Sequence, residues 1–194
     1  MNGAMSPLGA TARGLAIVAA TAAIQWWLGR SWWCETGDLN PWSSDTFTAH
    51  NSQHLFDPYT FTHVLHGLAF YAILWWLVGA RRNVATRGVI TVGLEAAWEL
   101  FENTSFVIER YRSETISLGY FGDSIANSIG DIAACAFGYL IAASVPVWGS
   151  VALFSTSELL LLWWIRDSLI LNVVMLLWSF EWLKEWQGGG GPLP

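Results

Sequence analysis

Long apolar stretches alternate along the chain with short polar segments, and each stretch approaches the length of a membrane-spanning helix. A helix needs roughly 20 mostly apolar residues to cross a bilayer. The pattern predicts six such stretches. The last is short and contains Asn172 and Glu181, so it either crosses fully or lies along the membrane interface. The predicted spans are residues 14–29, 60–80, 88–108, 121–143, 147–165 and 168–183.

These spans predict an all-α fold: an integral membrane helical bundle of five to six transmembrane helices. Pro146 separates the fourth span from the fifth, because proline lacks the backbone donor that a continuous helix needs. We expect residues 1–187 to form a single transmembrane helical domain without a separate soluble domain. The glycine-rich residues 188–194 are expected to form a flexible tail.

Composition supports a membrane location. Of the 194 residues, 54% are hydrophobic and 12% are charged, whereas a soluble domain carries about 25% charged residues. The 14 tryptophans are typical of side chains that anchor at the membrane–water interface. With a net charge of −6, the chain offers no basic surface for nucleic acid. We therefore expect membrane lipid, and not nucleic acid, as a partner.

The distribution of arginine predicts the orientation, because cytoplasmic loops carry an excess of Lys and Arg. Arg81, Arg82 and Arg87 cluster between the second and third spans. Arg13 precedes the first span. We therefore predict a cytoplasmic N-terminus, with the long polar segment 31–59 on the opposite side of the membrane.

The two cysteines are predicted to stay unpaired. Cys34 lies in the outer segment, and Cys135 lies in the middle of the fourth span. A disulfide needs a Cα separation of about 4.4–6.8 Å, which their different depths disfavour. Cys135 is then most simply a small buried hydrophobic residue.

The third predicted span carries three carboxylates on one face. A charged group at the centre of a bilayer costs about 3 kcal/mol or more, so its presence points to function. Glu95, Glu99 and Glu102 recur at intervals of four and three residues, which places them on one helical face. Three neighbouring carboxylates cannot all be ionised without partners, so they bind cations, share protons or pair with His or Arg.

Two further polar sets lie at a similar predicted depth. His63 and His66 are three residues apart and share a helical face. Asp123, Asn127 and Asp131 recur every four residues in the fourth span. A packing seam of small residues is the alternative for this last set, although packing alone would not need two aspartates. We expect the three sets to converge on one polar site that faces the outer leaflet.

Histidine with aspartate and glutamate is the ligand set of zinc, iron and manganese. A divalent metal with three protein ligands keeps an open position and lowers the pKa of its bound water to about 7. We expect such a metal at the two histidines with one or more carboxylates, and another carboxylate as general base. The expected metal ligands are His63, His66, Glu99 and Asp123, and the expected catalytic residues are Glu99, Glu102, Asp123 and Asp131.

Other polar residues are expected around this site, most of them near the ends of the predicted spans. Four of them are expected to line its mouth: His54, Asp57, Arg112 and Arg166. The others are Glu95, Asn103, Asn127 and Asp167.

Such a site fits three classes of function. The first is a metal-assisted or acid–base site that acts on a lipid-linked envelope substrate. The second is a small proton- or ion-coupled transporter, working as a homo-oligomer, because intramembrane carboxylates and histidines relay protons or bind ions. The third is a non-catalytic subunit of a larger membrane complex. The chain has no Walker loop, His-Glu-x-x-His or Gly-x-Ser-x-Gly motif, so the residues leave open whether it is an enzyme.

Several short motifs together resemble a known family. The resemblance is to an uncharacterised bacterial multi-pass inner-membrane protein family, a UPF-type domain of unknown function, over roughly residues 53–187. The motifs are Ser52-Gln53-His54, His63-Val64-Leu65-His66-Gly67, Trp98-Glu99-Leu100-Phe101-Glu102-Asn103, Glu109-Arg110-Tyr111-Arg112, Gly122-Asp123-Ser124-Ile125-Ala126-Asn127-Ser128 and Ile165-Arg166-Asp167.

A more distant resemblance is to the VanZ-like family linked to teicoplanin resistance. It rests on a histidine at the start of one helix, a Glu-rich next helix, an arginine, and then Asp123, Asn127 and Gly130. Together the resemblances imply a helical bundle in the bacterial inner (plasma) membrane and work on the cell envelope. They imply no established reaction.

Overall fold

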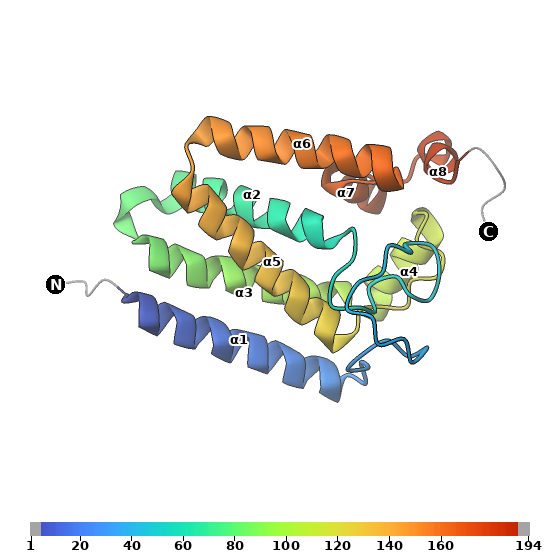
Figure 1. Ribbon diagram of the computed structural model, residues 1–194, viewed down its shortest axis with the longest axis horizontal. Coiled ribbons are helices and arrows are strands. Elements are labelled where there is room, and N and C mark those ends of the chain that lie inside the picture. The colour runs from blue at the N-terminus through green and yellow to red at the C-terminus, as the bar shows by residue number, and fades with distance from the viewer. Residues whose placement is uncertain (1–4, 190–194) are drawn as a thin grey trace.

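Residues 5–189 are described by a computed structural model, and within them all the named secondary-structure elements are helices, joined by segments without regular structure (Figure 1). The prediction of an all-α membrane bundle is confirmed. The helices are α1 (Pro7–Trp27), α2 (Thr60–Val78), α3 (Val84–Glu102), α4 (Ser105–Glu114), α5 (Ile125–Ser144), α6 (Val147–Ile165), α7 (Leu169–Leu177) and α8 (Glu181–Gln187), with a 3-10 turn, η1 (Gly79–Arg81), between α2 and α3.

Helix α5 packs closely against α2, with α3 and α1 beside it (Figure 1). A Cβ on Gly67 of α2 would collide with the backbone of Cys135 and Tyr139 in α5. A Cβ on Gly138 of α5 would likewise collide with the Val64 carbonyl in α2. Because small residues let transmembrane helices approach each other, these two glycines set the distance between α2 and α5.

Four helices, α1, α2, α5 and α6, are long and apolar enough to cross a membrane. Helix α3 has 19 residues, as α2 has, but it carries Arg87 and the three glutamates. It packs against α1, α2 and α5, so its polar face is covered by protein. The third predicted span, 88–108, ends early because the Thr104 side chain accepts a bond from the Val107 N–H and starts α4.

The sixth predicted span, residues 168–183, does not form one helix long enough to cross a membrane. It forms two short helices, of which α7 has nine residues. At 1.5 Å per residue α7 is about 13 Å long, against a hydrocarbon core of about 30 Å. The Glu158 carboxylate fixes the start of α7 by accepting bonds from the N–H groups of Leu169 and Ile170. Residues 190–194 of the predicted tail lie outside the described part of the chain.

Arg87 is a buried helical residue and not part of a loop. The structure places it in the first turn of α3, where its guanidinium lies over the rings of Tyr71 and Trp75 at 5.3 and 4.7 Å from their centroids. It also donates to the Gly79 carbonyl at 3.2 Å. The positive charge exposed in this turn is therefore that of Arg81 and Arg82.

The segment between α1 and α2 gathers with α4, α7 and α8 at one end of the bundle (Figure 1). It is tied to the start of α5 at several points. Arg30 donates to the carbonyls of Phe121 and Asp123 at 2.8 and 3.1 Å. Gln53 donates to the Gly122 carbonyl at 2.7 Å. This end of the molecule is therefore held as one unit, and it carries the polar site.

Candidate histidine–carboxylate site

His63 of α2 faces three buried carboxylates from two other helices. Its Nδ1 lies 2.5 Å from Glu95 Oε1 and 3.5 Å from Glu99 Oε1, both on α3. Its Nε2 lies 3.7 Å from Asp131 Oδ2 on α5. All four side chains are buried. The polar faces of α2, α3 and α5, which the spacing of these residues in the sequence predicts, thus meet at His63.

His66, one turn further along α2, also turns to Glu95. Its Nδ1 lies 3.0 and 3.1 Å from the two Glu95 oxygens, and its ring meets the Trp98 ring edge-on at a centroid distance of 6.2 Å. Glu95 therefore serves both histidines, whereas the sequence analysis placed it in the polar site but not among the expected metal ligands.

Glu99 and Asp131 have no lysine or arginine partner in the described part of the chain, and His63 is their one nearby basic group. Both carboxylate oxygens of Glu99 and Oδ1 of Asp131 are buried without a hydrogen-bond partner. Within residues 5–189, the only Lys or Arg that pairs with a carboxylate is Arg110, which meets Glu114 at 3.5 Å near the surface. Buried carboxylates without partners are strongly destabilising when ionised. The cluster therefore requires a bound cation or shared protons.

Two groups of side chains in the cluster are spaced to hold a metal ion, and His63 belongs to both. One is His63, His66 and Glu95, and the other is His63, Glu99 and Asp131; in each, one ligand atom from every residue lies within 4.8 Å of the others. Three protein ligands with an open position is the arrangement of a catalytic zinc site. Compared with the expected ligand set, Glu95 and Asp131 enter and Asp123 does not.

Asp123 is held by other partners. It precedes α5, and its carboxylate accepts bonds from Asn103 Nδ2 at 2.6 Å and from the Tyr120 hydroxyl at 3.1 Å. Asn103 returns the contact by accepting from the Asp123 N–H at 2.8 Å. Burial raises the pKa of the Asp123 carboxyl above its usual range. This pair joins the end of α3 to the start of α5, and Asp123 belongs to neither ligand group.

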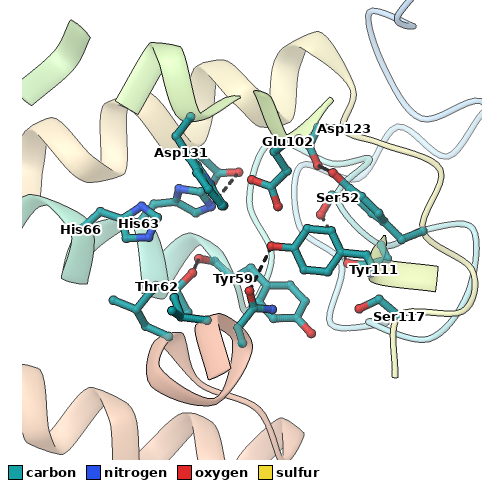
Figure 2. A pocket seen from close by; sticks show the side chains of 16 residues that line it. Ser52, Tyr59, Thr62, His63, His66, Glu102, Tyr111, Ser117, Asp123 and Asp131 are labelled. Atoms are coloured by element: carbon teal, nitrogen blue, oxygen red, sulfur yellow. Dashed lines mark hydrogen bonds and ion pairs between the residues drawn. The ribbon is translucent and has the colours of Figure 1, made fainter. Parts of the chain in front are cut away.

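A cavity of about 40 Å³ opens beside the two histidines (Figure 2). Figure 2 shows the Glu102 carboxylate and the Tyr111 hydroxyl pointing into the space that faces His63 and Asp131. The Tyr111 hydroxyl donates to Asn172 Oδ1 on α7 at 3.0 Å. A polar cavity of this size has room for about three waters, or for a metal ion with its water.

The four residues predicted at the mouth do not line this cavity. Arg112 is exposed on α4, and Arg166 ends α6 in the left-handed conformation and donates to the Trp186 carbonyl. Both arginines therefore point away from the site. His54 lies in the segment between α1 and α2, and Asp57 caps α2. For Arg112 the reason is that α4 is a separate helix, so Arg112 does not continue the polar face of α3.

Asp57 and Asp167 are buried, and their carboxylates accept hydrogen bonds from neighbouring groups. Asp57 accepts from the N–H groups of Tyr59 and Thr60 at 2.8 and 3.1 Å. Asp167 accepts from the Tyr59 hydroxyl at 3.1 Å and from Gln187 Nε2 at 3.1 Å. Burial raises the pKa of each carboxyl to about 6, against the hydrogen bonds that lower it.

Tyrosines are the site residues that sequence reasoning missed. Tyr59, Tyr111 and Tyr120 all line the cavity. All three lie outside the predicted spans, so helical periodicity could not group them with the other polar residues. The available signals were Tyr59, which directly precedes a predicted span, and Asn172, a polar residue within the sixth predicted span. Asn127 also has a structural task, since its amide donates to the His54 carbonyl at 2.8 Å and holds the long segment on α5.

The fold and this cluster define a class of protein: a helical membrane protein with a buried histidine–carboxylate cluster at one end of the bundle. The chain belongs to the family described as "Protein of unknown function (DUF2585)", which matches residues 25–189. The expected membership of an uncharacterised bacterial family is thereby confirmed.

Relatives of this chain are proteins of the same uncharacterised kind. The UPF0314 protein of Paracoccus denitrificans is 48% identical over 161 residues, covering 83% of each chain. The UPF0314 protein of Brucella anthropi is 46% identical over 175 residues, covering 90% of this chain and 88% of the relative. No solved structure matches. The more distant VanZ-like resemblance stays a prediction, because these matches do not extend to it.

Proposed function

We propose that the His63 cluster binds one divalent metal ion and uses it, with the surrounding carboxylates, in acid–base chemistry on the headgroup of a lipid-linked envelope substrate. The observation that carries the proposal is the excess of buried carboxylate: Glu95, Glu99 and Asp131 surround His63, and three of their oxygens have no partner. A divalent cation supplies the missing positive charge at the point where all these side chains meet.

The ligand groups suggest a division of roles. His63, His66 and Glu95 would hold the metal, and when bound it would supply positive charge and an activated water. Glu99 and Asp131 stand on the other side of His63 and would take up a proton. Glu102, which lines the cavity, is placed to exchange protons with a molecule that enters it.

A lipid headgroup is the proposed substrate because of the cavity's lining. Its lining includes histidine, carboxylate and tyrosine side chains together with the apolar side chains of Trp98, Leu169 and Val173. A headgroup would enter the polar part while the attached chains stay in the bilayer. We propose that the cavity faces the outer leaflet of the bacterial inner membrane with the N-terminus in the cytoplasm, since Arg81 and Arg82 occupy the turn at the opposite end of the bundle.

Metal content of the detergent-purified protein tests this proposal. The wild type, a His63→Ala/His66→Ala variant and an exposed control, Arg112→Ala, would be compared by elemental analysis and by thermal unfolding. We expect the double variant to lose one equivalent of zinc, iron or manganese that the control retains. Equal metal content in a folded double variant would overturn the proposal.

Shared protons are the other way to balance the cluster's charge. If the folded wild type holds no metal at the cluster, a small proton- or ion-coupled transporter becomes the better account. Proton uptake by vesicles that contain the protein, compared with vesicles that contain the Glu99→Gln variant, would then be the decisive measurement. A non-catalytic subunit would show neither metal nor proton movement and would copurify with a partner.

A further inference from the structure

A second cluster of metal-ligating side chains lies in the segment between α1 and α2, away from the cavity. Cys34 Sγ is 3.7 Å from His50 Nδ1, and the same nitrogen is 3.1 Å from His54 Nε2. One ligand atom from each of the three residues lies within 4.8 Å of the others. None of the three lines the cavity beside His63.

The geometry points to a zinc-binding site made of the Cys34 thiolate and the imidazoles of His50 and His54. In a tetrahedral zinc site with Zn–N near 2.0 Å and Zn–S near 2.3 Å, two nitrogens lie about 3.3 Å apart and a nitrogen and a sulfur about 3.6 Å apart. The separations of 3.1 and 3.7 Å found here are close to these values. Thiolate with imidazole is a ligand set that suits zinc.

Hydrogen bonds outside the cluster orient its donor atoms. His54 Nδ1 lies 2.6 Å from the Asn40 carbonyl, which can only accept, so Nδ1 carries the proton and Nε2 presents its lone pair to His50. A ligating histidine ordinarily makes such a bond with its other nitrogen. The Thr36 hydroxyl lies 3.1 Å from Cys34 Sγ and can donate to a thiolate.

The ligands are held in place by buried structure. Cys34 is 5% exposed and His54 is fully buried. The Trp33 ring meets the His54 ring edge-on at 6.4 Å, and the His54 backbone carbonyl accepts from Asn127 of α5. A site whose ligands are already fixed binds a metal without ordering flexible chain.

A plain hydrogen bond between the two imidazoles explains less of this arrangement. His50 Nδ1 would then donate its single proton to His54 Nε2. The same nitrogen, however, also faces the Cys34 sulfur, so one N–H would have to be shared between two acceptors. One metal ion placed among the three atoms satisfies all of them.

The proposed zinc site adjoins the cavity beside His63. Asn51 and Ser52, which lie between His50 and His54 in the sequence, both line that cavity. Ser52 has a φ of 57°, a left-handed conformation that a serine seldom adopts. A metal held on both sides of this residue would keep it there. Three protein ligands leave a fourth position for water.

Cobalt substitution tests this inference on the full-length protein, kept reduced in detergent. Co²⁺ bound by a thiolate gives a near-ultraviolet charge-transfer band, whereas Co²⁺ bound only by nitrogen and oxygen does not. We expect about one equivalent of Co²⁺ to produce the band in the wild type, and zinc to abolish it. The band should be lost in Cys34→Ser and in His54→Ala, and it should persist in His63→Ala/His66→Ala.

The chain has two cysteines, which makes Cys135→Ala the matched control. If Cys34→Ser fails to fold, persistence of the band in Cys135→Ala still assigns the sulfur ligand to Cys34. Absence of the band in folded wild type, or its loss in folded Cys135→Ala, would overturn the inference. The His63 cluster contains neither Cys34 nor His50. Failure of the proposed function would therefore leave the zinc site at Cys34 standing, and failure of this zinc site would leave the proposed function standing.

Discussion

His63 and Glu95 approach within 2.5 Å although they belong to different helices. Their contact joins α2 to α3 at the level where Asp131 of α5 also reaches His63. A membrane bundle gains little from burying one ion pair. The contact is better explained by what surrounds it, a group of acidic side chains whose charges exceed those of their histidine partners.

The Glu99→Gln variant tests whether the excess of acidic side chains lowers the stability of the metal-free protein and strengthens metal binding. Both Glu99 oxygens are buried without partners, so the neutral amide relieves repulsion from its acidic neighbours. We expect the metal-free variant to be about 1 kcal/mol more stable than the wild type. We expect its metal affinity to be at least about tenfold lower. Thermal unfolding with and without chelator measures both effects.

Glu109→Gln is the matched control, because Glu109 is exposed on α4. The same change of charge there should alter neither quantity. A Glu99→Gln protein that is less stable without metal would contradict the interpretation of a strained carboxylate.

Asp167 predicts a pH dependence of stability. Burial raises the pKa of its carboxyl from 3.8 to about 6 in the folded protein, so between these values the folded state binds more protons than the unfolded state. The free energy of unfolding therefore falls as the pH rises from about 4 to 6, by up to about 3 kcal/mol for this group. Asp57, with its pKa also raised to about 6, acts in the same direction.

Asp167→Asn should remove its share of this dependence. Unfolding curves of the chelated wild type and variant, recorded from pH 4 to 7, measure the difference between the two slopes. The wild type should lose more stability than the variant as the pH rises. Parallel slopes would show that Asp167 titrates alike in the folded and unfolded states.

Helical periodicity was enough to predict the centre of the candidate site. Glu95 and Glu99 lie on one face because they are four residues apart in a continuous helix, and the alternation of spans brings that face to His63. Periodicity failed at Asp123, because α5 begins only at Ile125. A residue before the helix start does not continue the helical face, and Asp123 is held by Asn103 instead.

The cluster of Cys34, His50 and His54 was beyond this kind of reasoning. Its residues lie in a segment without regular secondary structure, and they meet because the chain folds back on itself and is pinned to α5. His54 was selected for its residue type, but its partners depend on turns that have no period. Arg112 was misplaced because it lies on α4, a separate helix that the predicted span 88–108 did not resolve. Arg166 follows α6 where the pattern expected the helix to end, but its side chain donates to the Trp186 carbonyl.

Gly138→Ala should loosen the contact between α2 and α5. The added methyl group would collide with the backbone of Val64, which cannot move without shifting α2 and the His63 that it carries. Overpacking of this kind costs about 1–3 kcal/mol, and we expect metal affinity to fall as well. Gly14→Ala in α1 is the control, because a Cβ there meets nothing within 4 Å. It should leave thermal stability and metal binding unchanged or slightly improved.

The proposed orientation can be tested with single exposed positions at the two ends of the bundle. Leu39, 82% exposed, lies in the segment near the site, whereas Arg82 lies in the turn before α3. A membrane-impermeant maleimide should label Leu39→Cys in cells whose inner membrane is intact, and a reporter fused after Arg82 should read as cytoplasmic. Both native cysteines are buried, so the wild type is the labelling control. A reporter after Arg82 that reads as external would contradict the proposed orientation. The His63 cluster would then face the cytoplasm, where a substrate of the outer leaflet could not reach it.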